Sequence, residues 1–183
     1  MATDCPDVIL IRGAPGTGKT ETARALARHH PHGVWIEVDV LRAMVISVDW
    51  TSQHEHIQML SLAADLVAGF LRRGFSPVIV VDTFSGNKVE RFLEELETAR
   101  PGVEVRSFAI VAAPDVLRLR VEGRRDDQFK DHVVCQKLNA DVLRHLRPVD
   151  HLIDNTALTP EQTAEVILGR CREVLPPDNP AVC

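Results

Sequence analysis

Apolar and polar positions along the chain form two repeating patterns that predict an alternation of strands and helices. Short runs in which nearly every residue is apolar, many of them β-branched, predict strands that are buried on both faces. These runs are Val8 to Arg12, Val34 to Val38, Pro77 to Val81, Val103 to Val111, and a short segment around Leu152 and Ile153.

Between these runs, apolar residues recur every three or four positions, which is the spacing of a helix with one buried face. Two helix starts carry capping signals, Ser52 with Glu55 and Thr159 with Gln162. The expected helices cover residues 19–29, 52–73, 88–99, 133–146 and 159–174, and one more begins at 115 and runs into the charged stretch 120–131.

Strands that alternate with helices predict an α/β fold with a parallel sheet covered on both faces. The chain has 183 residues, a length typical of one domain, and we expect that domain to span residues 1–175. Pro176, Pro177 and Pro180 predict a flexible tail over residues 176–183. Ligands bind such a sheet at the carboxyl ends of its strands, so residues directly after the strands are the first site candidates.

The first predicted strand is followed by a phosphate-binding pattern. Residues Gly13-Ala14-Pro15-Gly16-Thr17-Gly18-Lys19-Thr20 match G-x-x-x-x-G-K-[ST] at every fixed position, between a strand and a helix. The glycines let successive N–H groups face one anion, and the helix N-terminus adds positive potential. We therefore assign residues 13–20 and Thr22 to a nucleotide, with Lys19 bridging the β- and γ-phosphates and Thr20 holding Mg²⁺.

Charge and composition narrow the class of protein. The net charge of −5 argues against a protein that mainly coats nucleic acid, although a nucleic-acid end stays open as a substrate. No apolar segment approaches the ~18 residues of a membrane helix, and the N-terminus lacks the pattern of a secretion signal. The four cysteines are scattered, which favours free thiols in a reducing cytoplasm over a disulfide framework or a zinc site. We predict a cytoplasmic protein.

On these residues the chain resembles the small P-loop kinases. This family includes nucleoside monophosphate kinases, shikimate and gluconate kinases, chloramphenicol phosphotransferase and polynucleotide 5′-kinases. The resemblance extends from Val8 to about Val174, and its most specific element is the phosphate loop. It implies a P-loop NTPase three-layer fold with five parallel strands in the order 2-3-1-4-5 and a helical lid around residues 120–138.

The resemblance also implies roles for residues that follow two of the strands. Asp39 would accept the proton of the acceptor hydroxyl, and Arg42 would hold an anionic group or the transferring phosphoryl group. Asp82 ends an apolar run in a Walker B-like pattern, so we expect it to hold Mg²⁺ together with Thr20. In some relatives the position of Asp82 contacts the substrate instead, and a turn or helix-capping Asp is the alternative without a ligand.

Arg120 and Arg124 lie four residues apart, which predicts one shared helix face. They resemble the Arg-x-x-x-Arg of the family, where these side chains border the lid and contact the nucleotide. Arg118 to Arg147 contains eight basic and five acidic residues, which fits a cationic lid or, alternatively, a solvated charged surface. Asn155 and Thr156 follow the last strand, where relatives contact adenine, although an ordinary turn explains them equally well.

Two histidines lie at the start of the helix that the resemblance places on the acceptor side. His54 and His56 are two residues apart and do not share a helix face, so we do not interpret them as a metal pair. Trp50 and Met59 nearby fit either an acceptor pocket or the core.

The sequence therefore predicts an enzyme, an ATP- and Mg²⁺-dependent phosphotransferase that moves the γ-phosphoryl group to a hydroxyl of a small molecule. Its candidate catalytic residues are Lys19, Asp39, Arg42 and Arg124. A polynucleotide 5′-hydroxyl kinase and a regulatory nucleotide-binding ATPase without an acceptor stay open as alternatives. The acceptor is not determined, because it depends on the variable helices and the lid.

Overall fold

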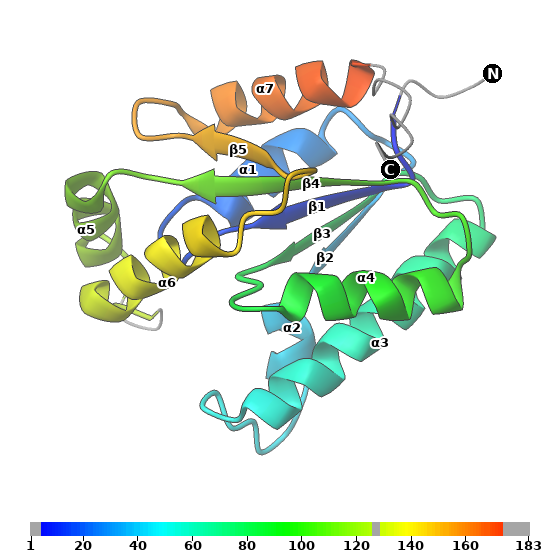
Figure 1. The fold of residues 1–183 in the computed structure, drawn as a ribbon, viewed down its shortest axis with the longest axis horizontal. Helices are drawn as coiled ribbons and strands as arrows, with labels where there is room; N and C mark the ends of the chain where they lie inside the picture. The colour runs from blue at the N-terminus through cyan, green and yellow to red at the C-terminus, as the bar shows by residue number, and fades with distance from the viewer. Residues whose placement is uncertain (1–4, 126–128, 174–183) are drawn as a thin grey trace, which may run out of the picture.

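Five parallel strands form one sheet, in the order β2-β3-β1-β4-β5 (Figure 1). The computed structural model describes residues 5–125 and 129–173. The strands are β1 (Val8–Arg12), β2 (Val34–Glu37), β3 (Val78–Asp82), β4 (Val105–Val111) and β5 (His151–Asp154). The predicted fold class and strand order are confirmed.

The two central strands β1 and β3 are buried along their whole length, which is why their sequences are almost continuously apolar. They pair in parallel with Arg12 level with Asp82. This register places Asp82 beside the residue that precedes the phosphate loop, at the carboxyl edge of the sheet.

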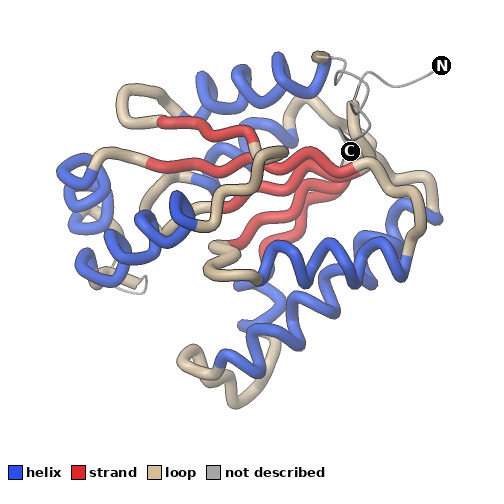
Figure 2. The backbone as a smooth tube through the Cα atoms, in the orientation of Figure 1, coloured by secondary structure: helices blue, strands red, loops and turns tan. Residues whose placement is uncertain are grey.

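Helices cover both faces of the sheet (Figure 2). On one face lie α1 (Lys19–Ala27) and α7 (Pro160–Arg172), and on the other lie α3 (Gln53–Arg72) and α4 (Lys88–Ala99). Leu26 and Ile167 are fully buried in the first layer, and Phe92 and Leu96 are fully buried in the second. Each such side chain contributes about 1.5–3 kcal/mol by leaving water.

Three further helices lie at the carboxyl ends of the strands, where the phosphate loop is. They are α2 (Val38–Ala43), which follows β2 directly, and α5 (Pro114–Glu122) and α6 (His132–Arg144), which follow β4. In Figure 1, α5 and α6 lie at the end toward which the arrow of β4 points.

The structure corrects two predictions about local structure. Strand β2 ends at Glu37, so Asp39 lies inside α2, a helix that the apolar pattern did not predict because no turn residue separates it from the strand. Helix α5 ends at Glu122 with Gly123 as its C-cap, so Arg124 lies beyond the helix. Arg120 and Arg124 therefore do not share one helix face.

Other boundaries agree within a few residues, and α4 agrees at both ends. The predicted tail over 176–183 and residues 126–128 of the predicted lid lie outside the described residues. Over the described ranges, no helix is both long and apolar enough to cross a membrane. Cys5, Cys135 and Cys171 are free thiols in the structure.

Candidate active site

The phosphate loop connects the end of β1 to the start of α1. Gly16 and Gly18 have φ angles of 91° and 87°, a left-handed conformation that glycine adopts without the strain other residues incur. The Thr17 hydroxyl donates to the Ala14 carbonyl oxygen at 2.9 Å and closes the loop on itself. Residues 13–20 thus form the concave turn and first helical residues that the motif predicts.

Lys19 and Thr20 begin α1 and face different partners. Lys19 is 8% exposed, and its Nζ lies 3.5 Å from the Ala14 carbonyl oxygen. Burial lowers the pKa of Lys19, whereas the charges of Asp39 and Asp82 act in the opposite direction. This buried cation, with two carboxylates in electrostatic reach, fits the role of balancing transferred phosphate charge.

Glu37 is a residue of this site that the sequence interpretation missed. It ends β2, and its Oε2 accepts a hydrogen bond from the Thr20 hydroxyl at 3.1 Å. Burial raises the pKa of Glu37, while the Thr20 hydrogen bond and Lys19 partly offset that rise. The bond leaves the lone pairs of the Thr20 oxygen available for Mg²⁺, so the donor set fits this cation. The strand-end rule applied to Asp39 would have found Glu37 if the predicted strand had ended at Ile36, two residues earlier.

Asp39 and Arg42 lie together on α2. Partial desolvation by nearby protein and the negative charge of Asp82 raise the pKa of Asp39, and Lys19 and Arg42 lower it in part. Arg42 is buried, donates from Nη2 to the Asp49 carbonyl oxygen at 3.2 Å, and stacks on the Trp50 ring at 4.7 Å. Trp50 is 52% exposed, so it belongs to the surface beside this site and not to the core.

Asp82 is buried and fully engaged by hydrogen bonds. Its Oδ2 accepts the Phe84 N–H at 2.8 Å, and the Nε2 of His56 lies 3.2 and 3.1 Å from Oδ1 and Oδ2. Burial alone would raise the pKa of Asp82, but its hydrogen bonds from His56 and Phe84, together with the charge of Lys19, hold that pKa below the usual range. The structure therefore brings Lys19, Asp39 and an anionic Asp82 together.

Arg120 and Asn155 support the phosphate loop through a series of hydrogen bonds. Arg120 donates to the Asn155 side-chain and backbone oxygens, both at 3.0 Å, and Asn155 Nδ2 donates to the Thr17 carbonyl oxygen at 2.6 Å. Thr156 closes a local turn, because it donates to Asp154 and accepts the Ala113 N–H at 2.8 Å. A contact of Arg120, Asn155 or Thr156 with the nucleotide stays a prediction.

Arg124 and Thr22, the two other predicted site residues, lie in different surroundings. Arg124 donates to the Phe129 carbonyl oxygen at 2.8 Å, and its charge lowers the pKa of Lys19, which locates it near the phosphate loop. Thr22 is buried in α1, and its hydroxyl has no hydrogen-bond partner among the described residues. A nucleotide-binding role for Thr22 stays a prediction.

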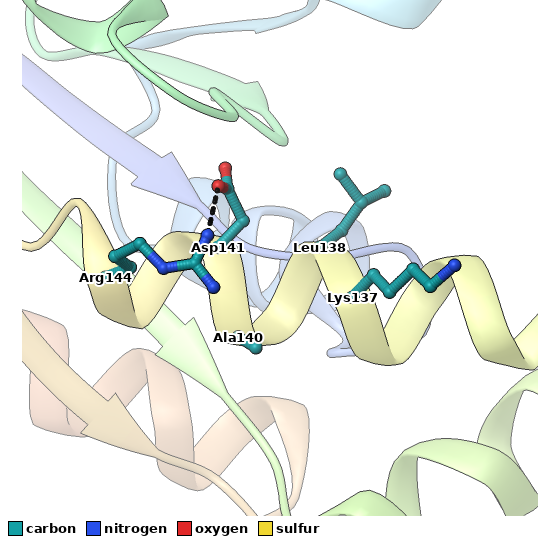
Figure 3. Close-up of a pocket in the computed structure, with 5 residues that line it drawn as sticks. All are labelled: Lys137, Leu138, Ala140, Asp141 and Arg144. Carbon is teal, nitrogen blue, oxygen red and sulfur yellow. Dashed lines mark ion pairs between the residues drawn. The ribbon is translucent and has the colours of Figure 1, made fainter.

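A shallow pocket lies on α6, and none of the predicted catalytic or cofactor-binding residues lines it (Figure 3). Asp141 faces Arg144 across 3.7 Å and accepts the Gly86 N–H at 2.7 Å, which ties α6 to the loop between β3 and α4. The pocket is lined by Lys137, Leu138, Ala140, Asp141 and Arg144.

Within residues 5–125 and 129–173, no group of three or more His, Cys, Asp or Glu side chains is arranged to hold a metal ion. Magnesium in nucleotide sites needs only one or two protein ligands, since waters and phosphates complete its octahedron. Thr20, with Glu37 and Asp82 nearby, meets that requirement.

The fold and the site define a kinase-like P-loop protein, and solved structures share this fold. One is a sugar kinase from Janibacter sp. HTCC2649, with a TM-score of 0.68 and 18% identity over 90% of this chain and 93% of that chain. Another is a gluconokinase from Sinorhizobium meliloti, with a TM-score of 0.62 and 19% identity over 90% and 93%. A third is a tunicamycin resistance protein from Deinococcus radiodurans, with a TM-score of 0.67 and 25% identity over 94% and 99%.

The sequence comparison identifies the family more narrowly. A family model described as an AAA domain (AAA_33) matches residues 8–149, and the chain belongs to this family. A comparison with curated proteins finds no significant match. The resemblance to small P-loop kinases that the sequence predicts is confirmed.

Proposed function

We propose that this protein is a phosphotransferase that uses ATP and Mg²⁺ and transfers the γ-phosphoryl group to a hydroxyl of a small-molecule acceptor. The observation that carries the proposal is the gathering of Asp39 and Asp82 around the buried Lys19 at the phosphate loop. A protein that only senses nucleotide needs no carboxylate on the acceptor side. A transferase does, because the attacking hydroxyl must lose a proton.

Each residue of this group has a defined task in the proposed reaction. The N–H groups of the phosphate loop and Lys19 bind the nucleotide phosphates, and Thr20, oriented by Glu37, would hold Mg²⁺ together with Asp82. Asp39 accepts the hydroxyl proton as the acceptor oxygen bonds to the γ-phosphorus and the bond from that phosphorus to the β–γ bridging oxygen breaks. ADP leaves with that oxygen, and Mg²⁺ at this site would neutralise phosphate charge.

The arginines have a supporting role in this proposal. Arg42 is buried beside Asp39 and is held by the Asp49 carbonyl and the Trp50 ring, so its guanidinium is preorganised for an anionic group. Arg124 approaches from the lid side, where it can balance charge on the transferring phosphoryl group.

A small-molecule acceptor agrees with the names of similar structures. Two of them are a sugar kinase and a gluconokinase, whose substrates carry hydroxyl groups. A cytoplasmic location stays part of this proposal.

The test is a screen of acceptors with ATP labelled at the γ-phosphate. Sugars, sugar acids, nucleosides, hydroxyl-bearing antibiotics and an oligonucleotide with a 5′-hydroxyl are incubated with the protein and Mg²⁺. The expected result is labelled product and increased ADP release with one class of small molecule. Transfer to the oligonucleotide alone would favour the polynucleotide kinase. ATP binding without acceptor-stimulated ADP release in the whole panel would favour a regulatory ATPase.

A further inference from the structure

A chain of hydrogen bonds runs from the surface of α4 to the buried carboxylate beside the phosphate loop. Lys88 Nζ lies 3.1 Å from the Ser85 hydroxyl oxygen and 3.2 Å from His56 Nδ1. On the other side of the ring, His56 Nε2 lies within 3.2 Å of both Asp82 oxygens. None of the residues Ser85, Lys88 and His56 has a role in the proposed transfer.

The chemistry of Lys88, His56 and Asp82 determines which group donates each of these hydrogen bonds. An ammonium group has three donors and no acceptor, so Lys88 donates and His56 Nδ1 must present a lone pair. The Nε2 atom then carries the hydrogen and donates it to Asp82. Of the two neutral forms of His56, the contacts therefore select the one protonated at Nε2.

These hydrogen bonds matter because Asp82 is buried. The Asp82 residue is 2% exposed, and His56 is 7% exposed. A buried carboxylate needs hydrogen bonds to replace its lost hydration, and a fully satisfied buried group is held rigidly. His56 supplies the only side-chain donor that the structure gives Asp82 among the described residues, and the Phe84 N–H supplies a backbone donor.

The same hydrogen bonds also connect two parts of the site. His56 belongs to α3, Lys88 begins α4, and Asp82 ends β3 level with Arg12, directly before the phosphate loop. Helix α3 follows α2, which carries Asp39 and Arg42. A shift of His56 would therefore alter the carboxylate that faces Lys19 and Asp39.

We propose that His56 is a positioning residue for phosphoryl transfer, which holds the Asp82 carboxylate in one orientation, and that Lys88 fixes the ring form that makes this possible. The effect on transfer rests on the proposed function, whereas the hydrogen-bond chain does not. Such outer-shell partners typically change activity by about 10–100-fold when removed.

The first experiment observes the ring directly, by NMR of the full chain labelled with ¹⁵N at histidine. The protein has eight histidines, so the His56 signals are assigned as those lost in His56→Gln. We expect long-range ¹H–¹⁵N correlations of a neutral ring protonated at Nε2, and a shift of the Nδ1 resonance in Lys88→Met. A ring protonated at Nδ1 or at both nitrogens would overturn the proposal.

The second experiment measures transfer kinetics with an acceptor identified in the screen. His56→Leu should lower kcat about 10–100-fold with an ATP KM within about 2-fold of the unchanged protein. His56→Gln should restore most of the rate, because its side-chain amide N–H can replace the Nε2 donor. His54→Leu, an exposed neighbour on the same helix, is the matched control and should leave kcat unchanged.

Lys88→Met keeps the test decisive if His56→Leu does not fold, since Lys88 is only partly buried. A folded Lys88→Met protein should also lose kcat, by a smaller factor. Full activity of folded Lys88→Met with an unshifted Nδ1 resonance would overturn the proposal. If the ring has the expected form but no acceptor is phosphorylated, then the proposed function fails while the hydrogen-bond chain stands.

Discussion

At the residue scale, this site depends on charges that are removed from water and compensated by one another. Lys19 and Asp82 are both buried, and Asp39 lies close enough for its pKa to respond to each of them. Desolvation strengthens such interactions, because the surrounding dielectric is lower than that of water. Changing one member should therefore alter the others, which makes single substitutions informative.

Replacing Lys19 tests the nucleotide side of the site. Lys19→Ala removes the cation that balances the β- and γ-phosphates, so transfer should fall by about 10²–10³-fold or more. We expect the fold to persist, because the phosphate loop is held by backbone and Thr17 contacts that do not involve Lys19. Circular dichroism monitors folding and labelled ATP monitors turnover. Undiminished turnover in folded Lys19→Ala would contradict the assignment.

Replacing Asp39 tests the acceptor side through the pH dependence of the rate. Because the pKa of Asp39 is raised, its carboxylate takes up a proton at a higher pH than an ordinary aspartate does. The rate of the unchanged protein should fall through that raised pKa. Asp39→Asn should lose about 10²–10⁴-fold in kcat and should also lose this acidic limb. ATP affinity, measured by calorimetry, should hardly change, and a collapse of ATP binding would show that Asp39 serves the nucleotide.

At the scale of elements, the segment from α5 to α6 contains Arg120 and Arg124, which make different kinds of contact. Gly123 ends α5 and leaves Arg124 in the connection to α6, where it contacts Phe129. Arg120 stays within α5 and braces Asn155 and the phosphate loop. Arg120 is therefore part of the framework, whereas Arg124 donates to the carbonyl of Phe129 in the connection, a position that suits the predicted lid.

Hydrogen exchange tests the predicted lid. An ATP analogue that cannot be hydrolysed should slow exchange over residues 129–138, because closure protects backbone N–H groups from solvent. Arg124→Ala should weaken ATP binding or lower the transfer rate about 10-fold or more. Arg118→Ala is the control, since Arg118 forms an exposed pair with Glu122 at 3.0 Å. Identical exchange with and without the analogue, together with full activity of Arg124→Ala, would exclude a lid.

At the scale of the whole molecule, Arg12 connects distant parts of the chain. It is the fully buried last residue of β1, and it donates to the His145 carbonyl at 3.1 Å, the Phe84 carbonyl at 3.1 Å and Asp150 at 3.3 Å. These partners belong to the end of α6, the loop after β3 and the loop before β5. Arg12 thus joins the end of α6 and the loops beside β3 and β5 to the first strand.

This connection predicts a large effect of Arg12 on stability. Arg12→Met leaves Asp150 with only part of its compensation, so the free energy of unfolding should fall by about 3 kcal/mol. Arg91→Met breaks an exposed pair with Glu95 and should cost less than about 1 kcal/mol. Urea denaturation of both variants provides the comparison. Equal losses would show that the buried network does not hold the molecule together.

Local patterns predicted the elements well, and long-range contacts account for what they missed. The phosphate loop and the apolar strands are contiguous in sequence, so their residue types indicate them directly. His56 and Lys88 gave no comparable signal, because their importance depends on partners in other elements. His56 meets Asp82 across 26 positions, and Asn155 meets Thr17 across 138 positions.

The sequence by itself determined the class of fold, the strand order implied by its family resemblance, and the place of the phosphate loop. It could do so because periodicity, glycine and capping residues act over a few neighbouring positions. Only the tertiary structure decided that Thr20 is oriented by Glu37, that Asp82 is held by His56, and that Arg120 braces the loop. Burial and hydrogen-bond geometry arise when separate elements pack, so no local pattern contains them.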